Sequence, residues 1–236
     1  MSKKIICWDV ETTPGIFATW SLTPEYIPHE GILKDWSLIC VSWKILGEKE
    51  VQTATITKPD DDLLVVKKVY EAFKDADLLV AHNGDKFDVK KLNTRIIYHG
   101  LDPLPPIQTL DTMKELKKVA AFTSNSLDYE CKFLGLGEKK KTRFNMWLKI
   151  REGDKVALKE MVDYNRHDVL LLEKLYLRTR KYFPNPPSMA STEGISCVTC
   201  GSKDITSQGT RTTKAGMVYP RFKCNACRSW FQGKNR

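Results

Sequence analysis

The stretch Ile5-Ile6-Cys7-Trp8-Asp9-Val10-Glu11-Thr12-Thr13-Pro14 decides how the chain is organised. Its apolar residues predict a buried strand that ends at the proline. Residues two apart in a strand point to the same side of the sheet, so Asp9 and Glu11 project side by side. Their like charges repel, and a divalent cation is the usual partner because hard cations prefer oxygen ligands. A strand end with two solvated acids explains this fragment equally well, so the rest of the chain has to decide.

The composition is that of an ordinary globular protein. The chain has 236 residues, of which 42% are hydrophobic and 28% charged, enough for one main domain and a small appendage. No apolar stretch approaches the roughly 20 residues that span a bilayer. The first strand is also too short for a signal-peptide core. We therefore expect a cytoplasmic protein with no membrane partner.

The positive charge is concentrated in the last quarter of the chain. Residues 1–183 contain 30 Lys and Arg against 27 Asp and Glu, a net charge of +3, whereas residues 184–236 contain 8 against 2, a net charge of +6. An excess of this kind indicates a polyanionic partner for the tail.

Strand and helix signals alternate over the first 183 residues, which is typical of an α/β fold. Asp60-Asp61-Asp62 is interpreted as a helix start, and Asp111 and Ser126 as helix caps. The proline-containing insert before Ser37 is expected to be irregular. Its Trp20, Tyr26 and Trp36 either pack on the core, which is the favoured role, or border the active cleft. Strands are expected at 39–46 and 51–56 (a hairpin), 78–81 and 107–110, and helices after 62, from 88 to about 97, at 127–134 and from 154 to about 182.

Three further residues carry chemistry on these elements. Asp88 lies where a strand passes into a helix, which is where open α/β sheets place their ligands. Tyr164 and Asp168 are four residues apart in the long last helix, so both can face one site. Asp9-x-Glu11, Asp88 and Tyr164-x-x-x-Asp168, in that order, resemble the DEDD exonuclease superfamily.

Tyr164 marks the resemblance as one to the tyrosine subfamily. The other subfamily has a histidine five residues before the last acid, and that position is Asp163 here. The resemblance covers residues 1–183 and is closest to phage and bacterial RNase H-like exonucleases that carry a zinc ribbon. The chain departs from many relatives at Lys90, where they have a proline. That departure leaves the start of the helix less rigidly defined but removes no ligand.

The resemblance implies an RNase H-like fold, a mixed five-stranded sheet flanked by helices with three antiparallel and two parallel strands. It implies two Mg²⁺ or Mn²⁺ ions and a 3′–5′ exonuclease that hydrolyses phosphodiester bonds of DNA or RNA, single-stranded or with a free 3′ end. By family role, Asp9 bridges the ions, Glu11 and Asp168 hold the ion beside the nucleophile, and Asp88 holds the other. Tyr164 would orient the attacking water, because a phenol titrates near pH 10, and Asn83 would contact the substrate.

Two alternatives stay open at this stage. One is a nucleic-acid-binding protein with a vestigial catalytic centre, against which the presence of all four acids and the tyrosine argues. The other is a structure-selective endonuclease that uses the same chemistry. The run Lys139, Lys140, Lys141 and Arg143 is either a solvated loop or a grip on phosphates.

Cys197-x-x-Cys200 and Cys224-x-x-Cys227 predict a four-cysteine zinc ribbon with one structural Zn²⁺. The other cysteines, Cys7, Cys40 and Cys131, are expected to be core thiols. The ribbon is either a structural staple or a nucleic-acid contact, and its basic and aromatic residues favour the second role. The predicted division is a nuclease domain at 1–183, a linker at 184–196 and the ribbon at 197–236. The residues expected to contact nucleic acid there are Arg211, Lys214, Arg221 and Lys223, with Tyr219, Phe222 and Trp230.

Overall fold

A computed structural model describes residues 3–191 and 194–233 of the chain. Its centre is a five-stranded sheet in the order β5-β4-β1-β6-β7. The three strands β5, β4 and β1 are antiparallel, and β6 and β7 run parallel to β1. This arrangement is the one that the sequence predicted. The strands are β1 (Ile5–Thr12), β4 (Leu38–Ile45), β5 (Gln52–Thr55), β6 (Leu78–Ala81) and β7 (Gln108–Asp111).

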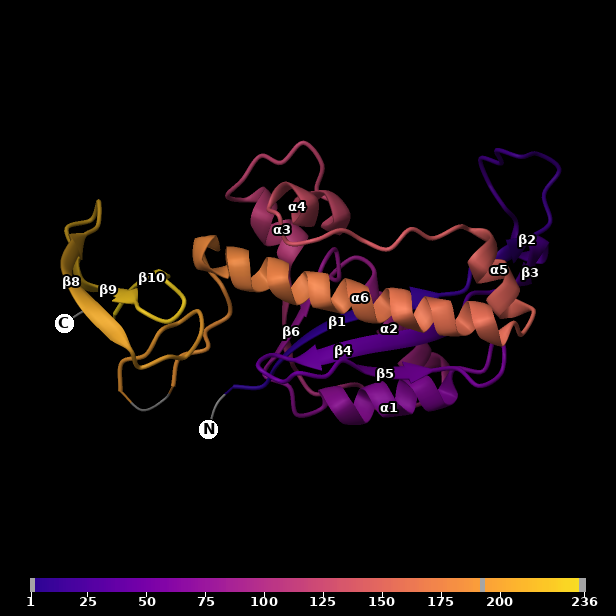
Figure 1. Ribbon diagram of the computed structural model, residues 1–236, viewed down its shortest axis with the longest axis horizontal. Helices are drawn as coiled ribbons and strands as arrows, with labels where there is room; N and C mark the ends of the chain where they lie inside the picture. Colours follow the sequence, from indigo (N-terminus) through magenta and orange to yellow (C-terminus); the bar gives the residue numbers. More distant parts are fainter. Residues whose placement is uncertain (1–2, 192–193, 234–236) are drawn as a thin grey trace.

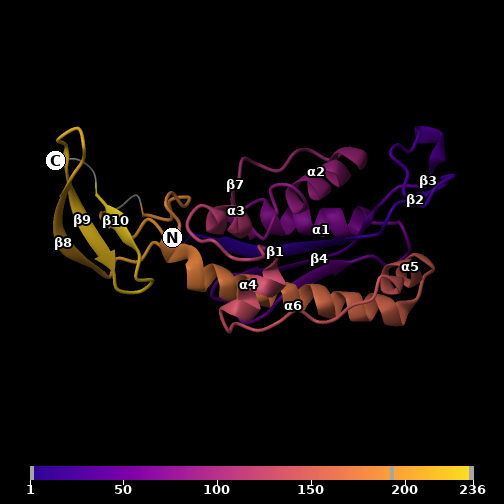
Figure 2. The same ribbon diagram turned by 90° about the horizontal axis from the view of Figure 1, so that it is seen from above.

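Helices cover both faces of this sheet. The helix α6 crosses one face and α1 lies against the other (Figure 1). Seen from above, α1 and α2 lie on one side of β1, whereas α4, α5 and α6 lie on the other (Figure 2). The helices are α1 (Leu63–Phe73), α2 (Asp88–Tyr98), α3 (Thr112–Lys117), α4 (Leu127–Phe133), α5 (Asn145–Arg151) and α6 (Lys155–Thr179), followed by a 3-10 turn, η2 (Arg180–Tyr182).

The strand β1 separates two sets of side chains. Trp8 is buried on the α1 face, where its ring meets Phe73 edge-on at 5.1 Å. Cys7 belongs to a different core cluster, which contains Leu171 and Leu175 of α6. Because neighbours in a strand alternate, Asp9 and Glu11 share the side of Cys7 and face α6. As expected from their apolar surroundings, Cys7, Cys40 and Cys131 are buried free thiols.

The predicted caps are confirmed at two helices. Asp111 accepts hydrogen bonds from the backbone nitrogens of Met113 and Lys114 at the start of α3, and Ser126 accepts one from Tyr129 in α4. The long helix α6 begins at Asp154, whose side chain accepts from the backbone nitrogens of the second and third residues that follow it. These caps satisfy donors that the first turn of a helix leaves free.

Asp62 has another role than the predicted helix start. The helix α1 does begin at Leu63, but the Asp62 side chain makes no cap hydrogen bond and is fully buried. It accepts from Arg95 at 2.6 and 2.8 Å, from the Leu38 nitrogen at 2.8 Å, and lies 2.6 Å from His99. Burial opposes ionisation, but these hydrogen bonds, that from Arg95 foremost, lower the pKa of Asp62. This carboxylate therefore joins α1 to α2 and β4.

The insert before Ser37 is more regular than expected. A short hairpin of β2 (Ile16–Phe17) and β3 (Ile32–Lys34) projects from the sheet, with a 3-10 turn, η1 (His29–Gly31), between its strands (Figure 1). Trp36 packs against the core as expected. Trp20 and Tyr26 do not, because Trp20 is fully exposed and Tyr26 is 73% exposed.

Arg151 anchors the base of this hairpin to α5. Its guanidinium donates to the carbonyl oxygens of Pro14 at 2.7 Å and Asp35 at 2.5 Å, and to the Asp60 carboxylate at 3.0 Å. The arginine is only 8% exposed, so these hydrogen bonds replace water that the guanidinium has lost. Both ends of the insert are thus held by one side chain.

The C-terminal part forms a separate three-stranded antiparallel sheet in the order β10-β9-β8. It lies beyond the C-terminal end of α6 in both views (Figures 1 and 2). Phe183 and Met189 of the connecting segment are buried in the domain core. Parts of the three predicted segments, namely residues 1–2, 192–193 and 234–236, lie outside the described residues. The strands are β8 (Ile205–Thr212), β9 (Val218–Cys224) and β10 (Trp230–Gln232).

Among the residues that the structure describes, no helix has both the length and the apolar character needed to cross a membrane.

Candidate active site and four-cysteine site

The fold brings three of the predicted acids together. Asp9 and Glu11 come from β1 and Asp168 from the middle of α6, and each offers a carboxylate oxygen within 4.8 Å of the others. Asp168 is buried, whereas the other two are half-buried. Three carboxylates at this spacing form an oxygen-rich group of the kind that binds Mg²⁺ or Mn²⁺.

Asp88 is held beside this group but is not one of the three. It is the first residue of α2, it is 3% exposed, and its Oδ1 accepts a hydrogen bond from the Val10 nitrogen at 3.0 Å. Val10 lies between Asp9 and Glu11, so this hydrogen bond ties Asp88 to the acidic end of β1. The preceding turn needs Gly84, because a Cβ there would lie 2.3 Å from the Cβ of Ala81.

The pKa values of Asp9, Glu11, Asp88 and Asp168 are all raised. Burial is the main cause for all four, and the neighbouring carboxylates add to it at Asp9 and Glu11. The pKa of Glu11 rises to about 7, and that of Asp88 also rises to about 7. The protein alone therefore does not offset the negative charge that it gathers here.

The only cation within salt-bridge distance of these acids in the described residues is the Lys139 ammonium. Its Nζ lies 2.7 Å from Oδ2 of Asp168 and 5.2 Å from the centroid of the Tyr164 ring. The Lys139 charge acts to lower the pKa of Asp168, against burial. The other oxygen of Asp168, Oδ1, is buried and has no hydrogen-bond partner. Asp168 already pairs with one positive charge and keeps a second oxygen without a hydrogen-bond partner. The site therefore suits a cation.

Tyr164 lies one helical turn before Asp168 in α6. It is half-buried, and burial together with the Asp168 charge raises its pKa to about 12. The phenol of the metal-free site is therefore protonated at neutral pH and can donate or accept a hydrogen bond. Its ring meets that of Trp147 edge-on at 6.5 Å.

Two residues that sequence reasoning missed hold the acids of β1 in place. Asn165 is fully buried and donates from Nδ2 to Oδ2 of Asp9 at 2.6 Å. Trp147 of α5 donates from Nε1 to Oε2 of Glu11 at 3.3 Å. Asn165 follows the motif tyrosine directly, which was the one available signal. Trp147 gave none, because α5 itself was not predicted.

The predicted substrate-binding residues near this site are scattered. Lys140 pairs with Asp163, whereas Lys141 and Arg143 line a pocket between α5 and the start of α6. Asn83 has a positive φ of 63° and its backbone nitrogen donates to Asp111 at 2.9 Å. Of the four basic residues in the run, only Lys139 reaches the acids.

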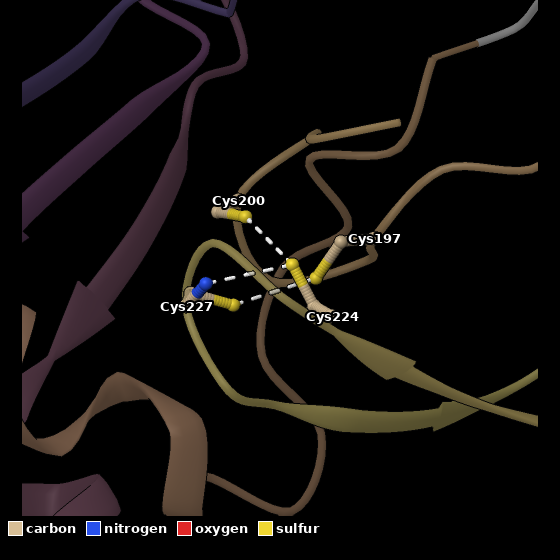
Figure 3. Close-up of side chains that lie close together, drawn as sticks. All are labelled: Cys197, Cys200, Cys224 and Cys227. Carbon is tan, nitrogen blue, oxygen red and sulfur yellow. Dashed lines mark hydrogen bonds between the residues drawn. The ribbon is translucent and has the colours of Figure 1, made fainter. Parts of the chain in front are cut away.

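The four cysteines of the tail converge on one point (Figure 3). The Sγ atoms of Cys197 and Cys227 are 3.6 Å apart, and those of Cys200 and Cys224 are 3.7 Å apart. A tetrahedral zinc with zinc–sulfur bonds of about 2.3 Å has ligands about 3.8 Å apart. The sulfurs therefore fit a four-cysteine Zn²⁺ site. In the adjoining strands, Arg211, Lys214 and Arg221 are exposed and Lys223 is half-exposed.

Comparisons with known proteins agree with this fold. The family model described as the RNase_H superfamily matches residues 37–179, more than half of the chain. The chain belongs to the RNase_H superfamily. The matched region of this RNase_H-superfamily protein contains Asp88, Tyr164 and Asp168 and begins after β1.

Two individual proteins resemble parts of this RNase_H-superfamily chain. The DNA polymerase III PolC-type of Ureaplasma parvum is 36% identical over 146 residues, which is 54% of this chain and 9% of that protein. The family B DNA polymerase of the archaeon Pyrobaculum calidifontis superposes with a TM-score of 0.57 at 14% identity, covering 76% of this chain and 25% of that one. The second likeness shows the fold alone. The chain spans about a tenth of the first relative and a quarter of the second.

Proposed function

We propose that this protein is a metal-dependent 3′–5′ exonuclease of the DEDD type, tyrosine subfamily, that hydrolyses phosphodiester bonds of DNA or RNA. The observation that carries the proposal is the convergence of Asp9, Glu11 and Asp168 around a single lysine ammonium. A structural role alone does not explain why the fold gathers buried carboxylates whose pKa values are all raised. Membership of the RNase_H superfamily and the similarity to a stretch of the PolC-type DNA polymerase support a nucleic-acid substrate.

Asp9, Glu11, Asp88 and Asp168 would hold two Mg²⁺ or Mn²⁺ ions. The donor set fits, because it is made of carboxylate oxygens, one of which lacks any hydrogen-bond partner. When bound, such ions supply an activated water and stabilise the leaving oxygen. Asn165 and Trp147 would keep the carboxylates of β1 in orientation, since each donates to an oxygen that faces the site.

Tyr164 would position the attacking water by its hydroxyl group. Its raised pKa in the metal-free site favours orientation of the water over removal of its proton. Lys139 would leave Asp168 when a metal ion binds, and its ammonium would then be free to meet a phosphate of the strand.

We further propose a division into a nuclease domain at 1–183, a linker at 184–196 and a zinc ribbon at 197–236. Cys197, Cys200, Cys224 and Cys227 would hold one structural Zn²⁺. The ribbon would aid nucleic-acid binding through Arg211, Lys214, Arg221 and Lys223. No Asp or Glu follows Asp204 in the sequence, so no acid lies between these basic residues along the chain.

The proposal is tested with end-labelled single-stranded DNA and RNA, in linear and circular form, with Mn²⁺, Mg²⁺ or EDTA. We expect mononucleotides from linear strands, released from the 3′ end, only with a divalent ion. Asp9→Ala should abolish the activity while the protein stays folded. The matched control is Asp163→Asn, an exposed acid one residue before Tyr164, which should keep the activity.

Each of the other outcomes contradicts part of the proposal. Cleavage of circular strands would show an endonuclease on the same site. Metal-dependent activity that persists in Asp9→Ala would show that Asp9 is not part of the active site. Absence of cleavage with intact binding would show a vestigial centre.

A further inference from the structure

One face of the ribbon sheet is basic and carries an exposed tryptophan. Tyr219, Arg221 and Lys223 alternate along β9, so their side chains share a face. The register places Arg211 opposite Tyr219 and Trp230 opposite Lys223, on that same face. We call these five residues the tryptophan face.

Trp230 is not packed into the ribbon. It is 53% exposed, and the guanidinium of Arg221 and the ammonium of Lys223 lie 5.3 and 5.6 Å from its ring centroid. The alternate residues Phe222 and Phe231 stack on each other at 5.5 Å on the opposite face. The packing of the small sheet therefore uses the phenylalanines and leaves the indole to solvent.

The charge on this part of the chain is mostly positive. From Ile205 to Arg236 the sequence contains seven Lys and Arg residues and no Asp or Glu, and the preceding acid, Asp204, accepts a hydrogen bond from Nδ2 of Asn225 at 2.8 Å. The side chain of Arg221 is held in place, because its Nε and Nη2 donate to the carbonyl of Gln208 at 3.1 and 3.0 Å. An exposed, flat aromatic ring with two positive charges beside it, of which Arg221 is held in place, suits a partner that offers both an aromatic face and an anion.

We propose that the tryptophan face is a stacking platform for single-stranded nucleic acid. An unpaired base stacks on Trp230 while Arg221, Lys223 and Arg211 meet the adjoining phosphates. A duplex keeps its bases stacked on one another, so it offers the phosphates without a free aromatic face. This inference rests on the proposed function in that the strand bound here is the one that the nuclease domain cleaves.

The separation between the acids and the ribbon limits which strands can contact both. Eleven residues of α6 separate Asp168 from Thr179, which is about 16 Å at 1.5 Å per residue. The ribbon lies beyond that end of the helix (Figures 1 and 2). At about 3.4 Å per stacked nucleotide, a strand of three nucleotides spans about 10 Å, which is shorter than this stretch of α6. We therefore expect such a strand to occupy the acids without touching Trp230.

The test uses the full-length, zinc-loaded protein and fluorescence anisotropy without added Mg²⁺ or Mn²⁺. The probes are a 20-nucleotide oligo-dT, a three-nucleotide oligo-dT, a 20-base-pair duplex and heparin, a polyanion without bases. Trp230→Ala is compared with Trp230→Phe, with Arg221→Gln, and with Val218→Ala, an equally exposed apolar residue of β9. Zinc content is measured for every variant to confirm that the ribbon is folded.

We expect Trp230→Ala to weaken binding of the 20-nucleotide strand by about 5- to 100-fold, the loss of one base–aromatic stack, without changing the salt slope. Trp230→Phe should restore most of the affinity. Arg221→Gln should reduce the salt slope by about 0.7. Binding of the three-nucleotide strand, the duplex and heparin should not respond to Trp230→Ala.

Unchanged affinity of Trp230→Ala for the 20-nucleotide strand would overturn the proposal, and so would an equal loss for heparin, which would show a charge effect only. Preference of the intact chain for polyglutamate over oligo-dT would instead show an acidic protein partner. These outcomes are independent of catalysis, because the binding test contains no added divalent ion. Cleavage of the three-nucleotide strand in a separate assay with Mn²⁺ tests the nuclease site without the ribbon.

Discussion

The Lys139 ammonium lies 2.7 Å from Oδ2 of Asp168, inside a group of carboxylates that all have raised pKa values. The pair joins the basic run after α4 to the middle of α6. We expect an exchange, in which the lysine offsets the acids until a metal ion takes its place. The stability of the protein would then depend on both the lysine and the metal.

Lys139→Gln should therefore destabilise the metal-free protein selectively. Removing one partner of a buried ion pair costs about 3–5 kcal/mol, and the 29% exposure of Lys139 reduces this to about 1–3 kcal/mol. At about 2–4 °C per kcal/mol, thermal unfolding in EDTA should show a clear decrease in Tm, and Mn²⁺ should reverse most of it. The control is Lys140→Gln, the neighbour that pairs with exposed Asp163. Equal Tm values in EDTA for the two variants would refute the exchange.

Tyr164→Phe should separate positioning from metal binding. The variant keeps the ring that packs against Trp147 and loses only the hydroxyl, so we expect turnover to fall by roughly 10- to 1000-fold with the metal requirement unchanged. Single-turnover rates over a range of Mn²⁺ concentrations measure both quantities. Tyr182→Phe, at an exposed position in η2, is the matched control. A shifted metal requirement would place the phenol among the ligands instead.

Trp147→Phe, in contrast to Tyr164→Phe, should change the metal requirement. It removes the donor to Glu11 but keeps an aromatic ring against Tyr164. Loss of a hydrogen bond that orients a metal ligand typically costs 10- to 100-fold in metal affinity or activity, and the 3.3 Å distance favours the lower end. We expect the Mn²⁺ concentration for half-maximal rate to increase about tenfold, whereas Phe144→Leu at the exposed start of α5 should leave it unchanged. An unaltered metal requirement in Trp147→Phe would show that this contact only packs the helix.

Glu130 should make the protein less stable as the pH rises. Burial raises its pKa to about 7, from about 4.5 in an unfolded chain, and its oxygens have no hydrogen-bond partner. The native state then holds a proton that the unfolded state releases, so stability falls between about pH 4.5 and pH 7 and stays lower above. Glu130→Gln removes this titration. Its stability relative to wild type should therefore increase from pH 5 to pH 8 in urea unfolding, and exposed Glu160→Gln should show no such trend. A difference that is constant across this range would contradict the assignment.

Much of the fold and of the site followed from local patterns. The i, i+2 spacing put Asp9 and Glu11 on one face of β1, and the i, i+4 spacing put Tyr164 and Asp168 on one side of α6. The mixed five-stranded sheet, which the family resemblance implied, was confirmed. The contacts of Trp147 and Asn165 were not accessible in this way. They join residues 136 and 156 positions apart, and nothing in their own neighbourhood indicates what they meet.

Asp62 is a second case in which a local pattern did not predict the contacts of a side chain. Three adjacent aspartates before an apolar run are typical of a helix start, and a helix does begin there. Only the fold shows that Arg95 of α2 and His99, which follows α2 directly, approach Asp62, so that this aspartate belongs to a buried ion pair. Local propensity placed the element, and tertiary contacts decided the role of its side chain.

Arg151 gives the projecting hairpin the character of an exchangeable part. Its hydrogen bonds to Pro14 and Asp35 hold both ends of the insert, three residues after Glu11 and just before β4, whereas Trp20 and Leu22 at its tip are fully exposed. We expect sequence changes between those ends to leave the positions of Asp9 and Glu11 in β1 unchanged. We therefore expect the tip to tolerate replacement by a segment from another protein, as long as Arg151 still holds the two ends of the insert.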